Sequence, residues 1–123
     1  MNTKQFGNIG IGKAINHFLS CGYIVSLPIN DSQPYDIIVE INNKLYKIQV
    51  KMTGQKKENG IFLVDLRSTG GNQSRNTIKF FDKNSCDYIF ACTSDNETFL
   101  IPSEICNKNS ISLGDKFKKF MVQ

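Results

Sequence analysis

The sequence predicts an α/β domain built on a mixed central β-sheet that is flanked by helices. Two observations support this class. Residues 7–21 repeat apolar side chains at the spacing of a helix with one buried stripe, and the later chain holds short strand-like runs separated by turn residues. With 123 residues, 40% of them apolar, the chain is long enough for one core, so we expect residues 1–123 to form a single domain.

The first half of the chain predicts a helix, a strand and then a hairpin. We expect Asn8 to cap the N-terminus of the helix and Gly22 to end it. The buried stripe would consist of apolar residues on one face: Ile11, Ala14, Ile15, Phe18 and Leu19. Residues 23–27 predict a short strand, which Pro28 closes, and a polar loop leads into a hairpin over residues 35–51.

The second half predicts three further strands and a short terminal element. Residues 61–67 have a strand pattern. Residues 68–85 show little periodicity and many Gly, Asn and Ser residues, which predicts a long loop of a kind that is often functional. The runs "DYIFACTS" and "ETFLIPS" predict a second hairpin that turns around Asp95 and Asn96. Alternating Phe and Lys residues near the C-terminus predict a short amphipathic helix or strand.

Composition narrows the range of possible functions only slightly. The formal net charge is +4, and no acidic residue precedes Asp31. A mildly basic chain suits an anionic partner such as nucleic acid, although many domains that bind no such partner carry similar charge. The cysteines form no CxxC pair, so we expect buried free thiols rather than a zinc site or disulfides. His17, the only histidine, is expected on the surface. With no leader and no long apolar run, the chain is expected to act in the cytoplasm.

The register of the first hairpin depends on its turn. Asn tolerates positive φ at lower cost than other non-glycine residues, so Asn42 and Asn43 can form a two-residue turn. Ile41 would then pair with Lys44. A three-residue turn would shift the register and move the following side chains to the opposite face.

Under the two-residue turn, three polar side chains gather at one end of the hairpin. Asp36 would face Gln49, and Lys51 would lie on the adjacent diagonal of the same face. A carboxylate and an amide oxygen on neighbouring strands are hard ligands that suit Mg²⁺. A nearby lysine can orient or deprotonate an attacking water, or stabilise charge that develops on a phosphate. The cluster therefore predicts metal-assisted phosphodiester hydrolysis.

The ordered motifs resemble the PD-(D/E)XK nuclease superfamily. "YD" at residues 35–36 and "QVK" at residues 49–51 match its hairpin motif, and a helix, "GY" at residues 22–23 and a strand precede them. The runs "GYIVSLP", "YDIIVE", "LYKIQVK" and "FLIPSE" are most similar to the group I intron homing endonucleases, in which glutamine replaces the usual acid. The resemblance covers residues 7–113 and implies a restriction-endonuclease-like core.

The resemblance implies a site-specific double-strand DNA endonuclease that uses Mg²⁺, with Mn²⁺ as an alternative ion. Asp36, Gln49 and Lys51 would be catalytic, and the metal would bind Asp36, Gln49 and the backbone carbonyl of Val50. Cutting both strands needs two sites, so we expect a homodimer, or the homotetramer that the subgroup suggests. The substrate would be DNA of the nucleoid.

One departure from the family keeps alternatives open. Many members place Glu on the first helix, and the corresponding position here is Ile11. Asn8, one turn earlier, would offer an amide oxygen in its place, or a phosphate or water would fill it. The missing acid keeps an inactive DNA-binding or assembly module as an alternative to a homing endonuclease. A junction resolvase and a restriction-type nuclease are further alternatives, since they are nuclease roles on the same fold.

The candidate DNA contacts lie in the loops that follow the first hairpin. Lys and Arg side chains are expected to meet phosphates, while Arg, Asn and Gln can read base edges in the major groove. The candidates are Lys56, Lys57, Arg67, Asn72, Gln73, Arg75 and Lys79. We expect Phe80 and Phe81 to pack in a core or an interface rather than to stack on bases.

Overall fold

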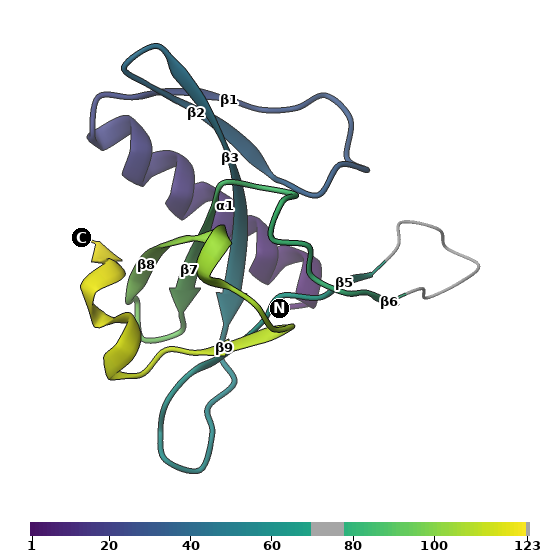
Figure 1. Ribbon diagram of the computed structural model, residues 1–123, viewed down its shortest axis with the longest axis vertical. Helices are drawn as coiled ribbons and strands as arrows, with labels where there is room; N and C mark the ends of the chain where they lie inside the picture. The colour runs from purple at the N-terminus through teal and green to yellow at the C-terminus, as the bar shows by residue number, and fades with distance from the viewer. Residues whose placement is uncertain (70–77, 123) are drawn as a thin grey trace.

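A computed structural model describes residues 1–69 and 78–122 (Figure 1). Its main sheet has six strands in the order β1-β2-β3-β7-β8-β10. The strands are β1 (Ile24–Ser26), β2 (Ile37–Ile41), β3 (Lys44–Thr53), β7 (Tyr88–Thr93), β8 (Thr98–Pro102) and β10 (Met121–Val122). The β3–β7 pair is parallel and the other neighbours are antiparallel, so the predicted mixed sheet and α/β class are confirmed.

The helix α1 (Thr3–Ser20) begins earlier than predicted. Its N-cap is Asn2, whose side chain accepts the Gln5 N–H at 2.9 Å, while the Gln5 side chain accepts the Asn2 N–H at 2.9 Å. This reciprocal capping box satisfies two donors at the helix end. The predicted cap, Asn8, lies inside the helix with an exposed side chain. In the described residues α1 is the only α-helix, and two 3₁₀ helices, η1 (Ser103–Ile105) and η2 (Asp115–Phe120), accompany it.

The C-terminal end of α1 agrees with the prediction, while its buried stripe agrees only in part. Gly22 has φ +83°, and its N–H donates to the Leu19 carbonyl at 2.9 Å. The buried positions are Gly10, Ala14 and Phe18, each four residues apart. Leu19 is 54% exposed, so its predicted burial is wrong.

The two faces of the sheet are covered by different elements (Figure 1). Helix α1 packs over one face, where the buried cluster includes Phe18, Ile37, Ile48 and Phe90. The opposite face packs against η2 and a two-stranded sheet of β4 (Leu63–Asp65) and β9 (Ser110–Ser112). That buried cluster contains Val64, Leu66, Cys86, Ile89, Ala91, Phe99, Ile101, Cys106, Ile111 and Phe117. Side chains that alternate along β3 therefore face α1 and β4 in turn.

The segment predicted as a long loop contains a short ribbon. Strand β5 (Ser68–Thr69) pairs antiparallel with β6 (Ile78–Lys79), and the ribbon projects away from the main sheet (Figure 1). The pairing corrects the prediction of a loop over residues 68–85 in which one short turn around "TIKFFD" was the only order expected. Residues 70–77 lie outside the described residues.

The remaining predictions are mostly confirmed. Strands β7 and β8 form the second hairpin, with Asn96 at φ 65° in its turn. The C-terminal segment contains both a short helix, η2, and a short strand, β10. All cysteines are free, but only three are buried, since Cys21 is exposed. His17 is half-buried with its ring centroid 5.3 Å from that of Phe90, so its predicted surface position is confirmed only in part. The described helices include none that is long and apolar enough to cross a membrane.

Candidate active site

The first hairpin has the predicted register. Asn42 and Asn43 take φ values of 52° and 65°, as a type I′ turn requires. Ile41 pairs with Lys44, and the same register continues along the two strands to the pair of Ile37 and Ile48. The side chains of Ile37 and Ile48 are buried beneath α1, so Gln49 and Lys51 of β3 face away from the helix.

Asp36 lies one residue before β2, at the point where the ladder ends. Its N–H donates to the Ile48 carbonyl at 2.9 Å, and its carboxylate Oδ2 accepts the Val50 N–H at 2.7 Å. Asp36 is thus not a paired strand residue opposite Gln49, as the regular register implied. Its carboxylate instead satisfies a backbone donor of β3, which fixes the side chain beside residues 49–51.

Gln49 is buried on the face of β3 opposite α1, with 9% of its surface exposed. Its side-chain oxygen Oε1 is buried and has no hydrogen-bond partner within the described residues. Gln49 lines a pocket of about 180 Å³, to which Lys79 and Phe80 also contribute. A buried acceptor without a partner costs about 1–3 kcal/mol. The site therefore contains an oxygen acceptor that is positioned by the fold and left unsatisfied by the described residues.

Lys51 is partly buried and lies near negatively charged groups. Its Nζ donates to the Arg67 carbonyl at 3.1 Å. Burial lowers the pKa of the Lys51 ammonium, while the charges of Asp36, Asp65 and Cys86 oppose that shift. Burial also raises the pKa of the Asp36 carboxyl, against the Val50 hydrogen bond and the charge of Lys51. The structure therefore brings Asp36, Gln49 and Lys51 into one cluster.

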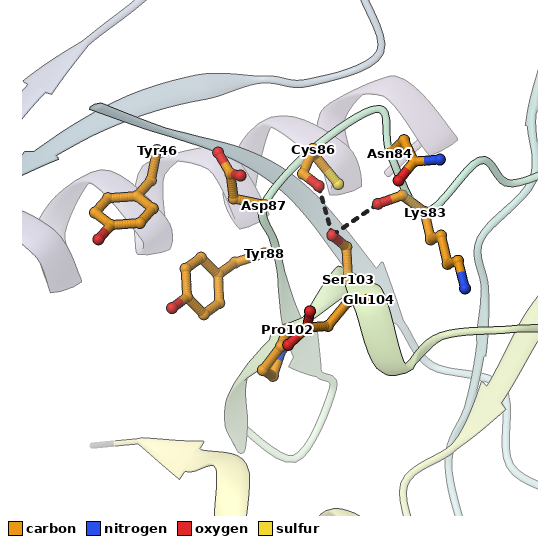
Figure 2. Close-up of a pocket in the computed structure, with 9 residues that line it drawn as sticks. All are labelled: Tyr46, Lys83, Asn84, Cys86, Asp87, Tyr88, Pro102, Ser103 and Glu104. Carbon is orange, nitrogen blue, oxygen red and sulfur yellow. Dashed lines mark hydrogen bonds between the residues drawn. The ribbon is translucent and has the colours of Figure 1, made fainter. Parts of the chain in front are cut away.

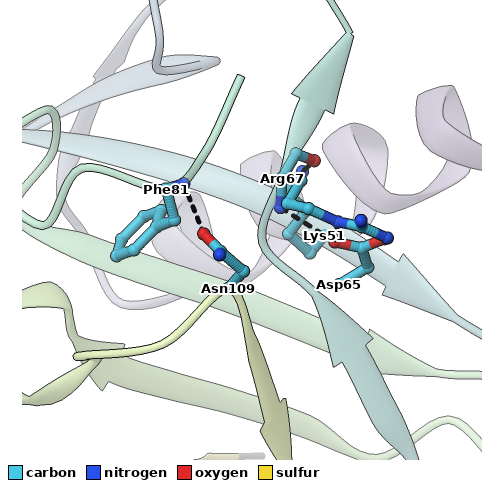
Figure 3. A network of polar contacts seen from close by, with 5 residues as sticks. All are labelled: Lys51, Asp65, Arg67, Phe81 and Asn109. Carbon is cyan, nitrogen blue, oxygen red and sulfur yellow. Dashed lines mark hydrogen bonds and ion pairs between the residues drawn. The ribbon is translucent and has the colours of Figure 1, made fainter. Parts of the chain in front are cut away.

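Sequence reasoning missed a second acid near Lys51. Asp65, at the end of β4, pairs with Arg67 through Nη2 to Oδ2 at 2.9 Å and Nε to Oδ1 at 3.0 Å (Figure 3). Hydrogen bonding from Arg67 lowers the pKa of Asp65, and this acid in turn raises the pKa of Arg67. The spacing "DLR" places both side chains on one side of an extended strand, which was the available signal.

The candidate DNA contacts separate into three groups. Lys79 lines the pocket of Gln49, and the backbone of Arg67 contacts Lys51. Lys56 and Lys57 lie on the β3–β4 connection, where they contact Asp95 at 3.3 Å and Ser112 at 3.3 Å. The remaining candidates lie outside the described residues: Asn72, Gln73 and Arg75.

The adjacent phenylalanines after β6 have different environments. Phe81 is half-buried against the core cluster, and its N–H donates to the side chain of Asn109 at 2.9 Å (Figure 3). Phe80 is 74% exposed and lines the pocket of Gln49 as well as a neighbouring pocket that Asp65 and Arg67 line. Core packing is therefore confirmed for Phe81. Phe80 lies outside the core, and its packing in an interface stays a prediction.

A separate pocket of about 340 Å³ contains none of the predicted site residues (Figure 2). Its lining residues come from β3, the segment before β7, the start of β7, the end of β8, and η1: Tyr46, Lys83, Asn84, Cys86, Asp87, Tyr88, Pro102, Ser103 and Glu104. The Ser103 hydroxyl donates to the carbonyls of Lys83 and Cys86, which ties the segment before β7 to η1. These contacts are structural and leave the hairpin cluster as the candidate active site.

The helix position at which the resemblance implied Glu is apolar here. Ile11 is half-buried and packs against the core beneath α1. The described residues contain no group of three or more His, Cys, Asp or Glu side chains that could hold a metal ion. The oxygen donors that the cluster does offer are the Asp36 carboxylate, the Gln49 amide and the Val50 carbonyl. In a strand, the N–H and the C=O of one residue point to the same edge. Since the Val50 N–H points to Asp36, the Val50 carbonyl points to the same edge as Asp36.

The fold and the hairpin cluster define a nuclease of the PD-(D/E)XK class. The sequence matches the family of PD-(D/E)XK endonucleases over residues 1–119, and the chain belongs to that family. It is also similar to the solved structure of a bacterial homing endonuclease, I-Ssp6803I, with 25% sequence identity and a TM-score of 0.79. The similarity covers 97% of this chain and 82% of that chain. No curated protein matches the sequence.

Proposed function

We propose that this endonuclease is a divalent-metal-dependent enzyme that hydrolyses phosphodiester bonds in both strands of DNA, and that it acts as a homing endonuclease. The observation that carries the metal dependence is the buried Oε1 of Gln49, which has no hydrogen-bond partner among the residues that the structure describes. The homing role is supported by the likeness to I-Ssp6803I and by the glutamine in the "QVK" motif.

The ligands fit a hard cation such as Mg²⁺, with Mn²⁺ as an alternative. Asp36, the Gln49 amide oxygen and the Val50 carbonyl would hold it, and water and substrate phosphate would complete its shell, as Mg²⁺ prefers. A bound ion would supply Lewis-acid stabilisation of the phosphate and a more acidic water. The Val50 N–H orients the Asp36 carboxylate through Oδ2 before any ligand arrives.

Lys51 is the group that acts on the reacting phosphate and the attacking water. Burial lowers its pKa, which favours the neutral form that a general base requires. In its charged form the same ammonium stabilises negative charge that develops on the phosphate. Its contact with the Arg67 carbonyl keeps the ammonium beside Asp36 rather than in solvent.

The DNA would lie across the site and the base of the β5–β6 ribbon. Lys79 and Arg67 border the pockets beside Gln49, where they can neutralise phosphates. Lys56, Lys57, Asn72, Gln73 and Arg75 are further proposed contacts. A double-strand break needs two active sites, so we propose a homodimer or homotetramer whose intracellular substrate is nucleoid DNA.

Cleavage of a plasmid library in Mg²⁺ or Mn²⁺ tests this function. We expect site-specific double-strand cuts that Asp36→Ala and Lys51→Ala abolish. Asp115→Ala and Lys118→Ala are matched controls, because they remove an exposed Asp–Lys pair on η2. Both controls should cut as the wild type does.

Three results would contradict the proposal. Tight DNA binding without cutting in either metal would indicate an inactive DNA-binding module, a candidate that the apolar Ile11 on α1 favours. Preferential cutting of four-way junctions over linear duplex would indicate a resolvase. Cutting by the Asp36 and Lys51 variants at wild-type rates would show that the hairpin cluster is not the active site.

A further inference from the structure

Asp65 lies near Lys51 but has no role in the proposed hydrolysis. The residue ends β4, where it pairs with Ser110 of β9. Its carboxylate accepts three hydrogen bonds from Arg67: from the backbone N–H at 2.9 Å, from Nε at 3.0 Å and from Nη2 at 2.9 Å. One side chain thus holds both the backbone and the guanidinium of a residue two positions later.

The backbone contact shapes the turn that follows β4. A short Asp side chain that accepts the N–H two residues on is a local turn former. The preceding Leu66 N–H donates to the Asn109 carbonyl at 2.8 Å, so the turn is also attached to the segment before β9. These two contacts determine where the Arg67 carbonyl points.

That carbonyl is the hydrogen-bond acceptor for Lys51, at 3.1 Å from Nζ. A lysine side chain has a flexible four-carbon stem, so its ammonium keeps one position only where a partner holds it. The chain of contacts therefore runs from Asp65, through the backbone of Arg67, to the ammonium of Lys51 (Figure 3).

We propose that Asp65 is a positioning residue, which fixes the Arg67 carbonyl and through it the Lys51 ammonium. The inference rests on the proposed function for the catalytic role of Lys51, while the positioning itself is a property of the chain. Because Asp65 acts through an accepted hydrogen bond, its oxygen matters more than its charge. Asparagine forms the same turn and keeps that acceptor.

Three variants test the proposal in cleavage assays. Asp65→Ala should lower kcat about ten- to hundredfold, the scale expected when a catalytic group is misplaced by about 1 Å. Its KM for DNA should be unchanged or lower, because Arg67 is released to meet phosphate. Asp65→Asn should restore kcat to near the wild-type value. Asn59→Ala is the control, because Asn59 Oδ1 accepts the Ile61 N–H at 3.1 Å in a similar exposed turn.

Two kinetic results would overturn the proposal: a wild-type kcat in Asp65→Ala, or an equal loss of kcat in both Asp65 variants. Crystal structures of the wild type and both variants decide it independently of activity. The contact between Lys51 Nζ and the Arg67 carbonyl should be lost in Asp65→Ala and kept in Asp65→Asn. If the wild type cuts no DNA, the proposed function fails, and this structural comparison still supports or overturns the positioning.

Discussion

Replacing Gly10 by alanine is expected to destabilise the protein, although alanine is the better helix former. Gly10 lies where α1 crosses β3, the strand that carries the candidate site. A Cβ at this position would lie 2.5 Å from Met52 Cγ and 3.2 Å from Val50 Cγ1. The first distance is a clash, so Met52 must move or α1 must shift away from β3.

Two opposing terms set the size of the effect. Alanine is about 1 kcal/mol more favourable than glycine in a helix interior. Inserting a methyl group into a filled contact costs about 1–3 kcal/mol. The free energy of unfolding should therefore fall by about 0–2 kcal/mol in Gly10→Ala. Gly12→Ala is the matched control, since its Cβ would meet nothing within 4 Å and the variant should gain about 1 kcal/mol.

Urea unfolding and thermal melting of both variants measure this difference. Gly10→Ala should be about 1–3 kcal/mol less stable than Gly12→Ala, which corresponds to a Tm roughly 4 °C lower for each kcal/mol. Any shift of β3 also moves Gln49 and Lys51, so cleavage should slow in Gly10→Ala and not in Gly12→Ala. Equal stabilisation of the two variants would refute the close packing of α1 on β3.

Three further outcomes are expected. Because burial raises the pKa of Asp36, its ionised form opposes folding, so Asp36→Asn should raise the metal-free Tm at pH 7, and the gain should fade as the pH falls towards 3.8. Gln49→Leu should need more Mg²⁺ for half-maximal cleavage, whereas Gln49→Glu should need no more than the wild type. A thiol reagent at pH 8 should label only exposed Cys21 in the native protein, because Cys92 and Cys106 are buried with their pKa raised to about 11. An unchanged melting curve, an unchanged metal requirement or rapid labelling of more than one thiol would contradict the respective prediction.

The sequence by itself determined the hairpin and its cluster, because their signals are local. Two consecutive Asn residues specify a two-residue turn, and the alternation of side chains then assigns each residue of β2 and β3 to a face. Ile37, Ile48, Gln49 and Lys51 therefore followed from counting. The signal for the end of α1, Gly22, was equally local. The start of α1 was misassigned because the capping box at Asn2 precedes the apolar stripe.

Only the tertiary structure decided what surrounds Lys51. Asp65 and Arg67 reach it because β4 pairs with β9, far along the chain, and packs over the face of β3 opposite α1. No local pattern encodes that pairing. The exposure of Phe80, and the lack of a partner for Gln49 Oε1 within residues 1–69 and 78–122, likewise depend on which elements cover that face. Local periodicity assigns residues to faces, while long-range packing determines which of them become buried, charged neighbours or ligands.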